Sequence, residues 1–165
     1  MVLWNSEGLN YVLSCNAYEY LKCFDIFMLT ETFHTSSLEV SGFYTYESFA
    51  LKPQRGRPIG GIVIGVKPAL KGKLISASDN HVVVETADVN LVCCYYNPKC
   101  DIIDIVDDLV TLMLKLDLNK RTIIGGDFNA RIDRRYVDKT DDLIDCMADF
   151  GLLLRNDRDE LTYMS

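Results

Sequence analysis

The amino-acid sequence predicts an α+β fold in which helices cover packed sheets. Of its 165 residues, 48% are apolar, which suits a packed core rather than a disordered chain. Short apolar runs typical of strands are interrupted by longer segments with helical spacing, so neither type of element dominates. The length fits one ordinary domain, and the sequence therefore predicts a single domain over residues 1–165.

Strands are predicted where short apolar or β-branched runs end in polar or turn residues. Residues 51–60 contain two prolines and two glycines, which indicates a loop between two of these runs. The predicted strands are Val2–Trp4, Asp25–Thr30, Gly61–Val66, His81–Glu85, Val89–Tyr96 and Arg121–Gly125.

The clearest predicted helix is Asp101–Leu118, because its apolar residues fall on one face at helical spacing. Asp101 and Asp104 lie where carboxylates complement the positive end of a helix dipole, so part of the acidity has a structural explanation. Leu9–Phe24 and Thr140–Phe150 are also compatible with helices.

The charge of the chain is uneven. A net charge of −7 is unfavourable for binding nucleic acid, yet residues 51–73 contain six Lys or Arg and no acid. A local basic surface on an acidic body can contact phosphates, although an ordinary solvated loop explains the same charges.

The sequence also predicts where the protein resides. No apolar stretch approaches the ~20 residues that a membrane helix needs. Residues 1–15 lack the basic start and apolar core of a secretory signal. Six cysteines without a C-x-x-C pair favour reduced thiols. We therefore expect an intracellular protein with no membrane partner.

Polar residues suited to phosphate chemistry follow four of the predicted strands. Asn5 follows the first strand and Glu31 the second, Tyr96 closes the Val89 strand, and Asp127 and Asn129 follow the Arg121 strand. A carboxylate at a strand end can bind Mg²⁺, which uses few protein ligands and keeps waters. Aspartate can orient or deprotonate water, and asparagine can donate to a phosphate oxygen. Taken singly, each residue is also explained as a cap, turn or surface residue.

Together these motifs resemble the endonuclease/exonuclease/phosphatase superfamily, in the same order along residues 4–130. The Gly-Gly-Asp-Phe-Asn-Ala segment at 125–130 is the most specific. Leu29–Thr32, the Arg57–Gly61 loop and Tyr96–Pro98 are most similar to the apurinic-like endonuclease domain of non-LTR retrotransposons. The resemblance implies a four-layered α/β/β/α sandwich of two packed mixed sheets.

The same resemblance implies a function and roles for the matching residues. It implies a Mg²⁺-dependent endonuclease, with Mn²⁺ as a substitute, that nicks double-stranded DNA in the nucleus. The nick leaves a 3′-hydroxyl that primes reverse transcription by a further domain of the element. Glu31 and Asn5 would bind the metal, Asp127 would orient or deprotonate the water, and Asn129 and Tyr96 would hold the scissile phosphate. The residues expected to contact nucleic acid are Arg55, Arg57, Asn97 and Arg131.

The sequence departs from the family pattern at its C-terminal side. The closing Ser-Asp-His block and the Asp-bearing strand before it have no counterpart, while Thr162–Tyr163 resembles the strand that precedes them. We therefore expect a C-terminally incomplete domain that lacks its last strands and is weakly active or inactive. His34 and His81 lie elsewhere and are expected to be surface or core residues.

Two other functions remain open from the sequence. One is a catalytically dead remnant that acts as a binding scaffold. The other is a phosphatase-like member of the same superfamily that acts on a small or lipid substrate.

Overall fold

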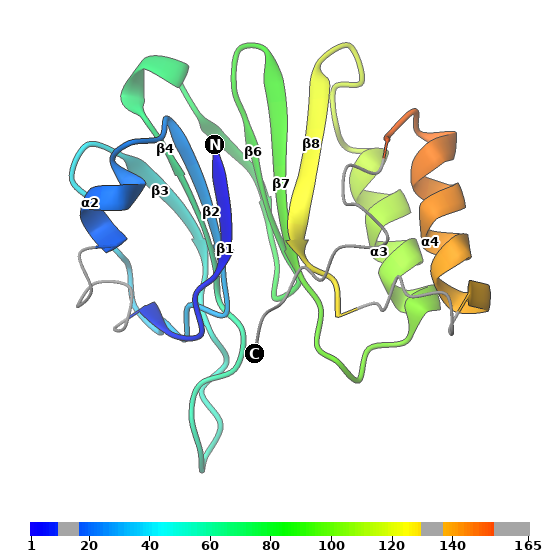
Figure 1. Cartoon of the computed structure of the whole chain (residues 1–165), viewed down its shortest axis with the longest axis horizontal. Coiled ribbons are helices and arrows are strands. Elements are labelled where there is room, and N and C mark those ends of the chain that lie inside the picture. The colour runs from blue at the N-terminus through cyan, green and yellow to red at the C-terminus, as the bar shows by residue number, and fades with distance from the viewer. Residues whose placement is uncertain (10–16, 130–136, 154–165) are drawn as a thin grey trace. The chain divides into compact units, whose positions relative to one another are not determined.

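The computed structural model of the chain describes residues 1–9, 17–129 and 137–153 (Figure 1). Its contacts divide the chain into two compact units. The first unit comprises Met1–Asn97 and Asp117–Phe128, and contains all eight strands found in the described residues. The second unit comprises Pro98–Leu116 and Asn129–Ser165.

One sheet of the first unit has the order β1-β2-β4-β3. Its strands are β1 (Val2–Asn5), β2 (Ile26–Thr30), β3 (Tyr44–Ser48) and β4 (Ile62–Val66). The short helix α2 (Ala17–Leu21) lies between β1 and β2 in the chain, and these two strands are parallel. The remaining pairs in this sheet are antiparallel.

The other sheet has the order β5-β6-β7-β8. It comprises β5 (Lys73–Ala77), β6 (His81–Glu85), β7 (Val89–Tyr95) and β8 (Arg121–Asp127). The first three strands form antiparallel neighbours, whereas β7 and β8 are parallel and place Tyr95 opposite Asp127. Each sheet is therefore mixed, and each contains one parallel pair.

The two sheets pack face to face, which confirms the predicted sandwich of two mixed sheets. Alternate residues of the strands point into this layer. A single buried cluster draws side chains from both sheets, among them Met28, Ile64, Val82 and Leu91. On the other face of the first sheet, Leu21 of α2 joins a second cluster with Phe27 and Leu29.

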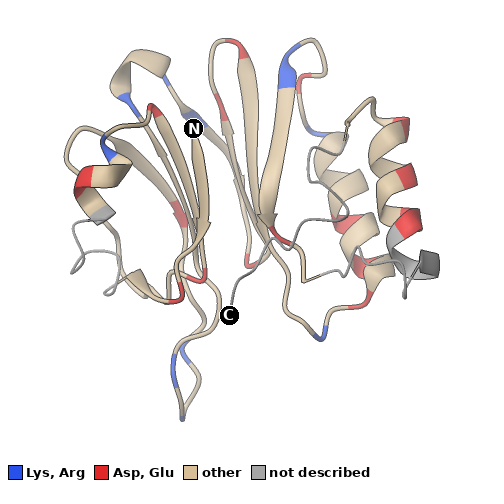
Figure 2. Ribbon diagram, viewed as in Figure 1, with Lys and Arg blue, Asp and Glu red and all other residues tan. Residues whose placement is uncertain are grey.

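The second unit contains two helices in its described part, α3 (Ile102–Met113) and α4 (Val137–Asp149). These helices contact each other. The apolar face predicted for α3 is buried only in part: Leu109 and Met113 are buried, whereas Ile103 is exposed. Acidic residues lie along both helices (Figure 2). None of the helices in the described ranges is long and apolar enough to cross a membrane.

The sequence did not indicate β3 and β5, which are the outer strands of their sheets. A bulge between Leu74 and Ser76 interrupts the alternation of β5, and β3 has only partly buried side chains. Conversely, β8 continues to Asp127, two residues past its predicted end. Of the predicted helix Leu9–Phe24, residues 10–16 lie outside the described residues, as does Thr162–Tyr163.

A substitution at Gly65 tests the packing of the first sheet. A Cβ at this position would lie 2.1 Å from the Phe27 ring, inside the cluster beneath α2. We expect Gly65→Ala to lower the free energy of unfolding by ~1–3 kcal/mol, the usual cost of overpacking a core. Urea denaturation followed by circular dichroism measures this.

Gly42→Ala serves as the control, because a Cβ there meets nothing within 4 Å, although the φ of +89° makes the backbone unfavourable for alanine. Its loss should be smaller, ~1 kcal/mol. Equal losses for the two variants would show that the Phe27 ring does not lie over Gly65.

Candidate active site

The carboxyl ends of two parallel strand pairs meet at one edge of the sandwich. Asn5 ends β1, and Asp127 ends β8 in the opposite sheet. Leu3 and Gly125 face each other two residues earlier, since a Cβ on Gly125 would lie 3.2 Å from Leu3 Cδ2. At the strand ends, Asn5 Nδ2 donates a hydrogen bond of 2.9 Å to Asp127 Oδ2. This bond connects the two sheets at the candidate site.

The Asn5 side chain is fixed at both ends of its amide. Its Oδ1 accepts the backbone N–H of Glu7 at 3.2 Å, while its Nδ2 donates to Asp127. An amide whose oxygen already accepts a bond must direct its NH₂ group to the carboxylate. Asn5 therefore orients the carboxylate of Asp127.

The glycine before Asp127 is required by the backbone. Gly126 has a φ of +150°, and a Cβ there would lie 1.9 Å from the carbonyl oxygen of Cys94. No side chain fits at this distance. The second glycine of the Gly-Gly-Asp motif therefore allows β8 to approach β7 closely just before the carboxylate.

Glu31 has a left-handed backbone, with a φ of +50°. Its carbonyl oxygen accepts the N–H of Gly8 at 2.8 Å, and the next residue, Thr32, donates its N–H to Gly61 at 3.2 Å. A strained non-glycine residue costs ~1–3 kcal/mol and persists where its surroundings fix it. Hydrogen bonds from both neighbouring segments thus hold the Glu31 backbone in place.

The tyrosine that reaches these carboxylates is Tyr95. Its side chain is buried, and its hydroxyl interacts with the Glu31 carboxylate. Burial, together with the negative charges of Glu31 and Asp127, raises the pKa of Tyr95 to about 12, while the positive charge of Arg57 opposes the shift. The phenol therefore keeps its proton, and remains a hydrogen-bond donor, at neutral pH.

Tyr96, which the sequence analysis placed at the phosphate, lies on the other face of its strand. It is fully buried, and its ring centroid lies 5.8 Å from that of Phe128. Consecutive residues of a strand face opposite sides, so only one of the two tyrosines can face the other sheet. The Tyr-x-Pro spacing favoured Tyr96, whereas the two-residue period through Leu91 and Cys93 points to Tyr95.

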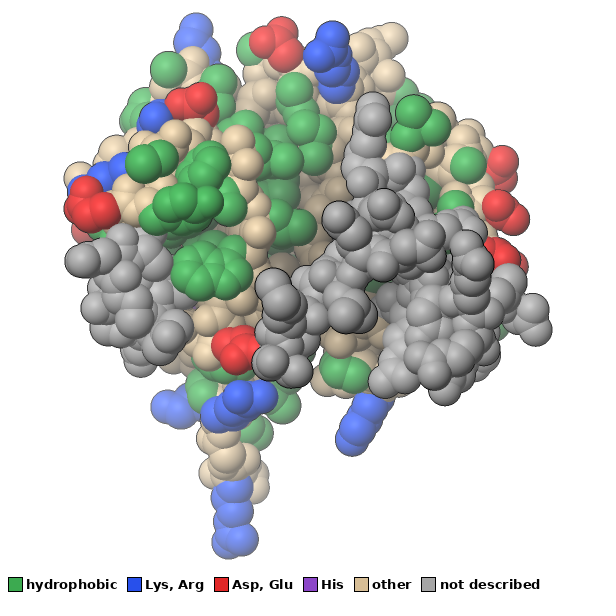
Figure 3. Space-filling view, in the orientation of Figure 1, with side chains coloured by type: hydrophobic (Ala, Val, Ile, Leu, Met, Phe, Trp, Pro, Cys, Tyr) green, Lys and Arg blue, Asp and Glu red, His purple; other side chains and the backbone are tan. Residues whose placement is uncertain are grey.

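A basic hairpin lies at the same end of the first unit. An isolated bridge between Leu51 and Ile59 closes it, and it extends beyond the strand ends in Figure 1. Arg55 and Arg57 are both exposed on this hairpin, and Figure 3 shows its basic side chains. The Arg57 guanidinium carbon lies 4.8 Å from the centroid of the Phe33 ring.

The other predicted contacts to nucleic acid are less defined. Asn97 is exposed directly after β7. Asn129 is exposed and left-handed, with a φ of +48°, and is the first residue of its segment in the second unit. Arg131 lies outside the described residues. The roles of these three residues stay predictions.

His81 is a core residue that supports the end of β7. Its ring nitrogens lie 3.1 Å from the hydroxyls of Ser76 and Ser78, which fixes the turn between β5 and β6. Asn80 in this turn accepts the backbone N–H of Tyr95 at 2.9 Å. His34 is half-buried.

The donor atoms at the strand ends fit a hard divalent cation. The described residues contain no cluster of three His, Cys, Asp or Glu side chains that could hold a metal. Glu31 and Asp127 nevertheless offer carboxylate oxygens, which Mg²⁺ and Mn²⁺ prefer, and Mg²⁺ commonly takes one or two carboxylates and completes its shell with water. The predicted ligand Asn5 lies beside them, with its amide nitrogen toward Asp127. These residues therefore suit a sparse metal site.

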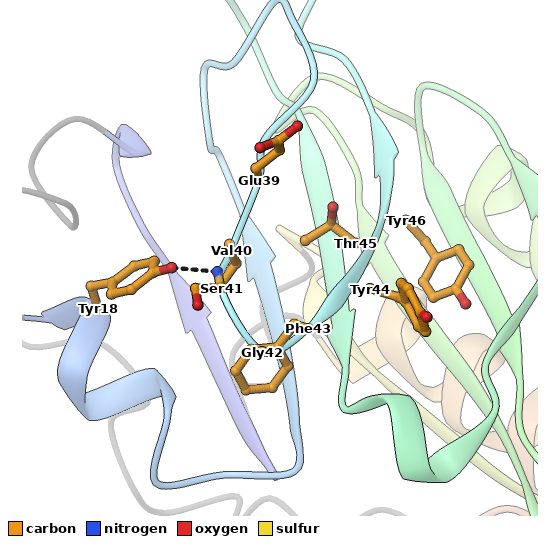
Figure 4. Close-up of a pocket in the computed structure, with 9 residues that line it drawn as sticks. All are labelled: Tyr18, Glu39, Val40, Ser41, Gly42, Phe43, Tyr44, Thr45 and Tyr46. Carbon is orange, nitrogen blue, oxygen red and sulfur yellow. Dashed lines mark hydrogen bonds between the residues drawn. The ribbon is translucent and has the colours of Figure 1, made fainter.

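A separate pocket of about 640 Å³ lies beside β3 (Figure 4). Its lining includes Tyr18, Tyr44 and Glu39, and the Ser41 N–H donates to the Tyr18 hydroxyl. The lining contains no lysine, arginine or histidine. None of the lining residues is Asn5, Glu31, Tyr95 or Asp127, so the pocket is separate from the candidate site at the strand ends.

Comparison with known proteins identifies the class. The family model described as "Endonuclease/Exonuclease/phosphatase family" matches residues 3–147, so the chain belongs to this family. By family it is a hydrolase of phosphate esters. No match was found among curated proteins.

Solved structures of two endonucleases have a similar fold. The endonuclease domain of TRAS1, a telomere-specific non-LTR retrotransposon, is 19% identical with a TM-score of 0.66, covering 98% of this chain and 75% of that one. An AP endonuclease from Archaeoglobus fulgidus is 15% identical with a TM-score of 0.59, covering 86% of this chain and 61% of that one.

The proton of Tyr95 provides a test of the site. Because the folded-state pKa of about 12 lies above the usual value of 10.0, the phenol stabilises the fold below pH 10. This stability is lost as the pH rises from 10 to 12. We expect the difference in phenolate absorbance between the parent protein and Tyr95→Phe to titrate near pH 12.

Glu31→Gln is the matched variant, because it removes one of the negative charges that raise this pKa. The Tyr95 titration should then move toward lower pH, while burial keeps part of the shift. An unchanged titration in Glu31→Gln would place the Tyr95 hydroxyl away from that carboxylate.

Proposed function

We propose that this protein is a divalent-metal-dependent endonuclease that cuts one strand of double-stranded DNA and leaves a 3′-hydroxyl. The observation that carries the proposal is that Glu31 and Asp127, at the ends of strands from opposite sheets, both lie close enough to the Tyr95 hydroxyl to raise its pKa. Asn5 donates a hydrogen bond to Asp127. Two oriented carboxylates beside a protonated phenol suit the hydrolysis of a phosphodiester.

Each residue has a distinct role in the proposal. Glu31, with Asn5 beside it, would hold Mg²⁺ or Mn²⁺, and the bound metal would neutralise phosphate oxygens and the leaving oxygen. Asp127, oriented by Asn5, would position the attacking water and accept its proton. Tyr95, whose hydroxyl interacts with Glu31, would hold that carboxylate in position, and Tyr96 remains the tyrosine predicted to bind the phosphate.

DNA is the proposed substrate because of the basic hairpin. The hairpin extends from the end of the sandwich at which the carboxylates lie, and it carries the exposed Arg55 and Arg57. A polyanion that reaches the site can contact both arginines. Two similar folds belong to endonucleases, one of them from a retrotransposon. Priming of reverse transcription by a further domain, and nuclear action, extend this proposal.

A binding scaffold is the second candidate. The observation that favours the scaffold is the position of His81, whose strand β6 pairs with β7. His81 lies between Ser76 and Ser78, so it supports the turn rather than the carboxylates. Such a scaffold would bind duplex DNA without cutting it.

Nicking of supercoiled plasmid in the presence of Mg²⁺ separates these functions. We expect slow conversion to open circles, which EDTA abolishes. Asp127→Asn should slow the reaction by ~10²–10⁴-fold, the usual contribution of a general base. Glu31→Gln should also lose activity, and Mn²⁺ should replace Mg²⁺.

Asp88→Asn is the matched control, because Asp88 is exposed in the turn between β6 and β7. It should nick at the parent rate. Duplex binding without nicking would support the scaffold instead. Hydrolysis of inositol phosphates without nicking would support a phosphatase, and equal rates for Asp127→Asn and the parent would refute the proposed site.

A further inference from the structure

Building on the proposed function, we propose that Arg57 and Phe33 form a phosphate clamp at the candidate active site. The Arg57 guanidinium, stacked on the Phe33 ring, would bind the non-bridging oxygens of the phosphodiester that is cut. Phe33 would be its positioning residue. The clamp selects phosphodiesters and other phosphate anions as ligands, independently of base sequence.

The contact between Arg57 and Phe33 leaves the guanidinium able to bind an anion. The guanidinium carbon lies 4.8 Å from the ring centroid, within the range of cation–π attraction. A stacked guanidinium keeps its N–H groups in the plane of the fork, where they can donate to two phosphate oxygens. Stacking also reduces the rotamer freedom that an exposed arginine would lose on binding.

Phe33 is a rigid platform for this contact. Its backbone is left-handed, with a φ of +54°, and its N–H donates to the Gly60 carbonyl at 3.0 Å. On the other side, a Cβ on Gly8 would lie 3.1 Å from the Phe33 ring. A bulky residue in this conformation is held by its neighbours and is typical of functional sites.

The platform lies close to the carboxylates. Phe33 follows Glu31 by two residues, and the base of the hairpin touches Tyr95, since a Cβ on Gly60 would lie 3.3 Å from the Tyr95 ring. The charge of Arg57 acts on the Tyr95 hydroxyl, which also interacts with the Glu31 carboxylate. Arg57 is therefore near the place where a phosphate would lie beside Glu31 and Asp127.

A cation is needed at this position for electrostatic reasons. Glu31 and Asp127 repel an incoming phosphate, and a metal held by few carboxylates offsets only part of that repulsion. An arginine beside the carboxylates supplies positive charge without depending on pH, because its guanidinium is always protonated. Among the described residues, no aromatic ring lies under the guanidinium of Arg55, two residues away on the same hairpin, so Arg55 serves as an internal comparison.

Two measurements test the clamp in the full chain. The first is the affinity for inorganic phosphate in the presence of Mg²⁺, measured by ³¹P NMR line broadening, which requires no catalysis. The second is the KM and kcat for bis(p-nitrophenyl) phosphate. We expect Arg57→Ala and Phe33→Leu each to weaken phosphate binding and raise KM about tenfold, with kcat changed much less, as expected for lost ground-state binding.

Matched variants separate the clamp from a general effect on folding. Phe33→Tyr keeps the aromatic face and should retain parent values, whereas Phe33→Leu keeps only apolar bulk. Arg55→Ala, which removes the other exposed arginine of the same hairpin, should weaken phosphate binding and raise KM much less than Arg57→Ala. Parent values in Phe33→Leu, or equal losses in Arg55→Ala and Arg57→Ala, would overturn the clamp.

The two proposals can fail separately. If the parent binds phosphate and Phe33→Leu does not, but neither hydrolyses a diester, the clamp stands and the endonuclease proposal fails. If the parent hydrolyses the diester and all Arg57 and Phe33 variants match it, the endonuclease stands and the clamp fails.

Discussion

The hydrogen bond between Asn5 and Asp127 is the interaction on which the site depends. Apolar packing between two sheets is non-directional, so by itself it only weakly fixes how far one sheet is shifted along the other. The hydrogen bond of 2.9 Å between Asn5 and Asp127 is directional, and it fixes this shift at the edge that carries the candidate site. A hydrogen bond to a charged group contributes ~1.5–3 kcal/mol, so it also stabilises the closed edge. The catalytic geometry and the closure of the sandwich therefore share one contact.

This contact requires backbone conformations that most residues avoid. Gly126 provides the close approach of β8 to β7, and Glu31 and Phe33 adopt left-handed conformations. These conformations are costly, and the hydrogen bonds with Gly8, Gly60 and Gly61 hold them. The segments at the site thus adopt locally unfavourable backbone conformations, and these conformations fix the orientation of the Asp127 carboxylate and of the Phe33 ring.

The sequence predicted much of this arrangement because the strands end in polar residues. Asn5 and Asp127 were expected together from their positions after strands, and the structure joins them directly. The motif spacing indicates Tyr96, but strand alternation decides which tyrosine faces the other sheet, and it turns Tyr95 toward Glu31. The role of Tyr96 stays a prediction. The contact between Phe33 and Arg57 could not be predicted, because neither the left-handed backbone of Phe33 nor this contact leaves a pattern in the sequence.

The most direct test of the account is the binding of Mn²⁺, followed by water-proton relaxation. The parent protein should bind the ion, and Glu31→Gln should lose most of that binding, because a sparse site depends on each carboxylate. Asp88→Asn, which changes an exposed acid in a distant turn, should bind as the parent does. Unchanged binding in Glu31→Gln would contradict the central claim that the strand-end carboxylates form the metal site.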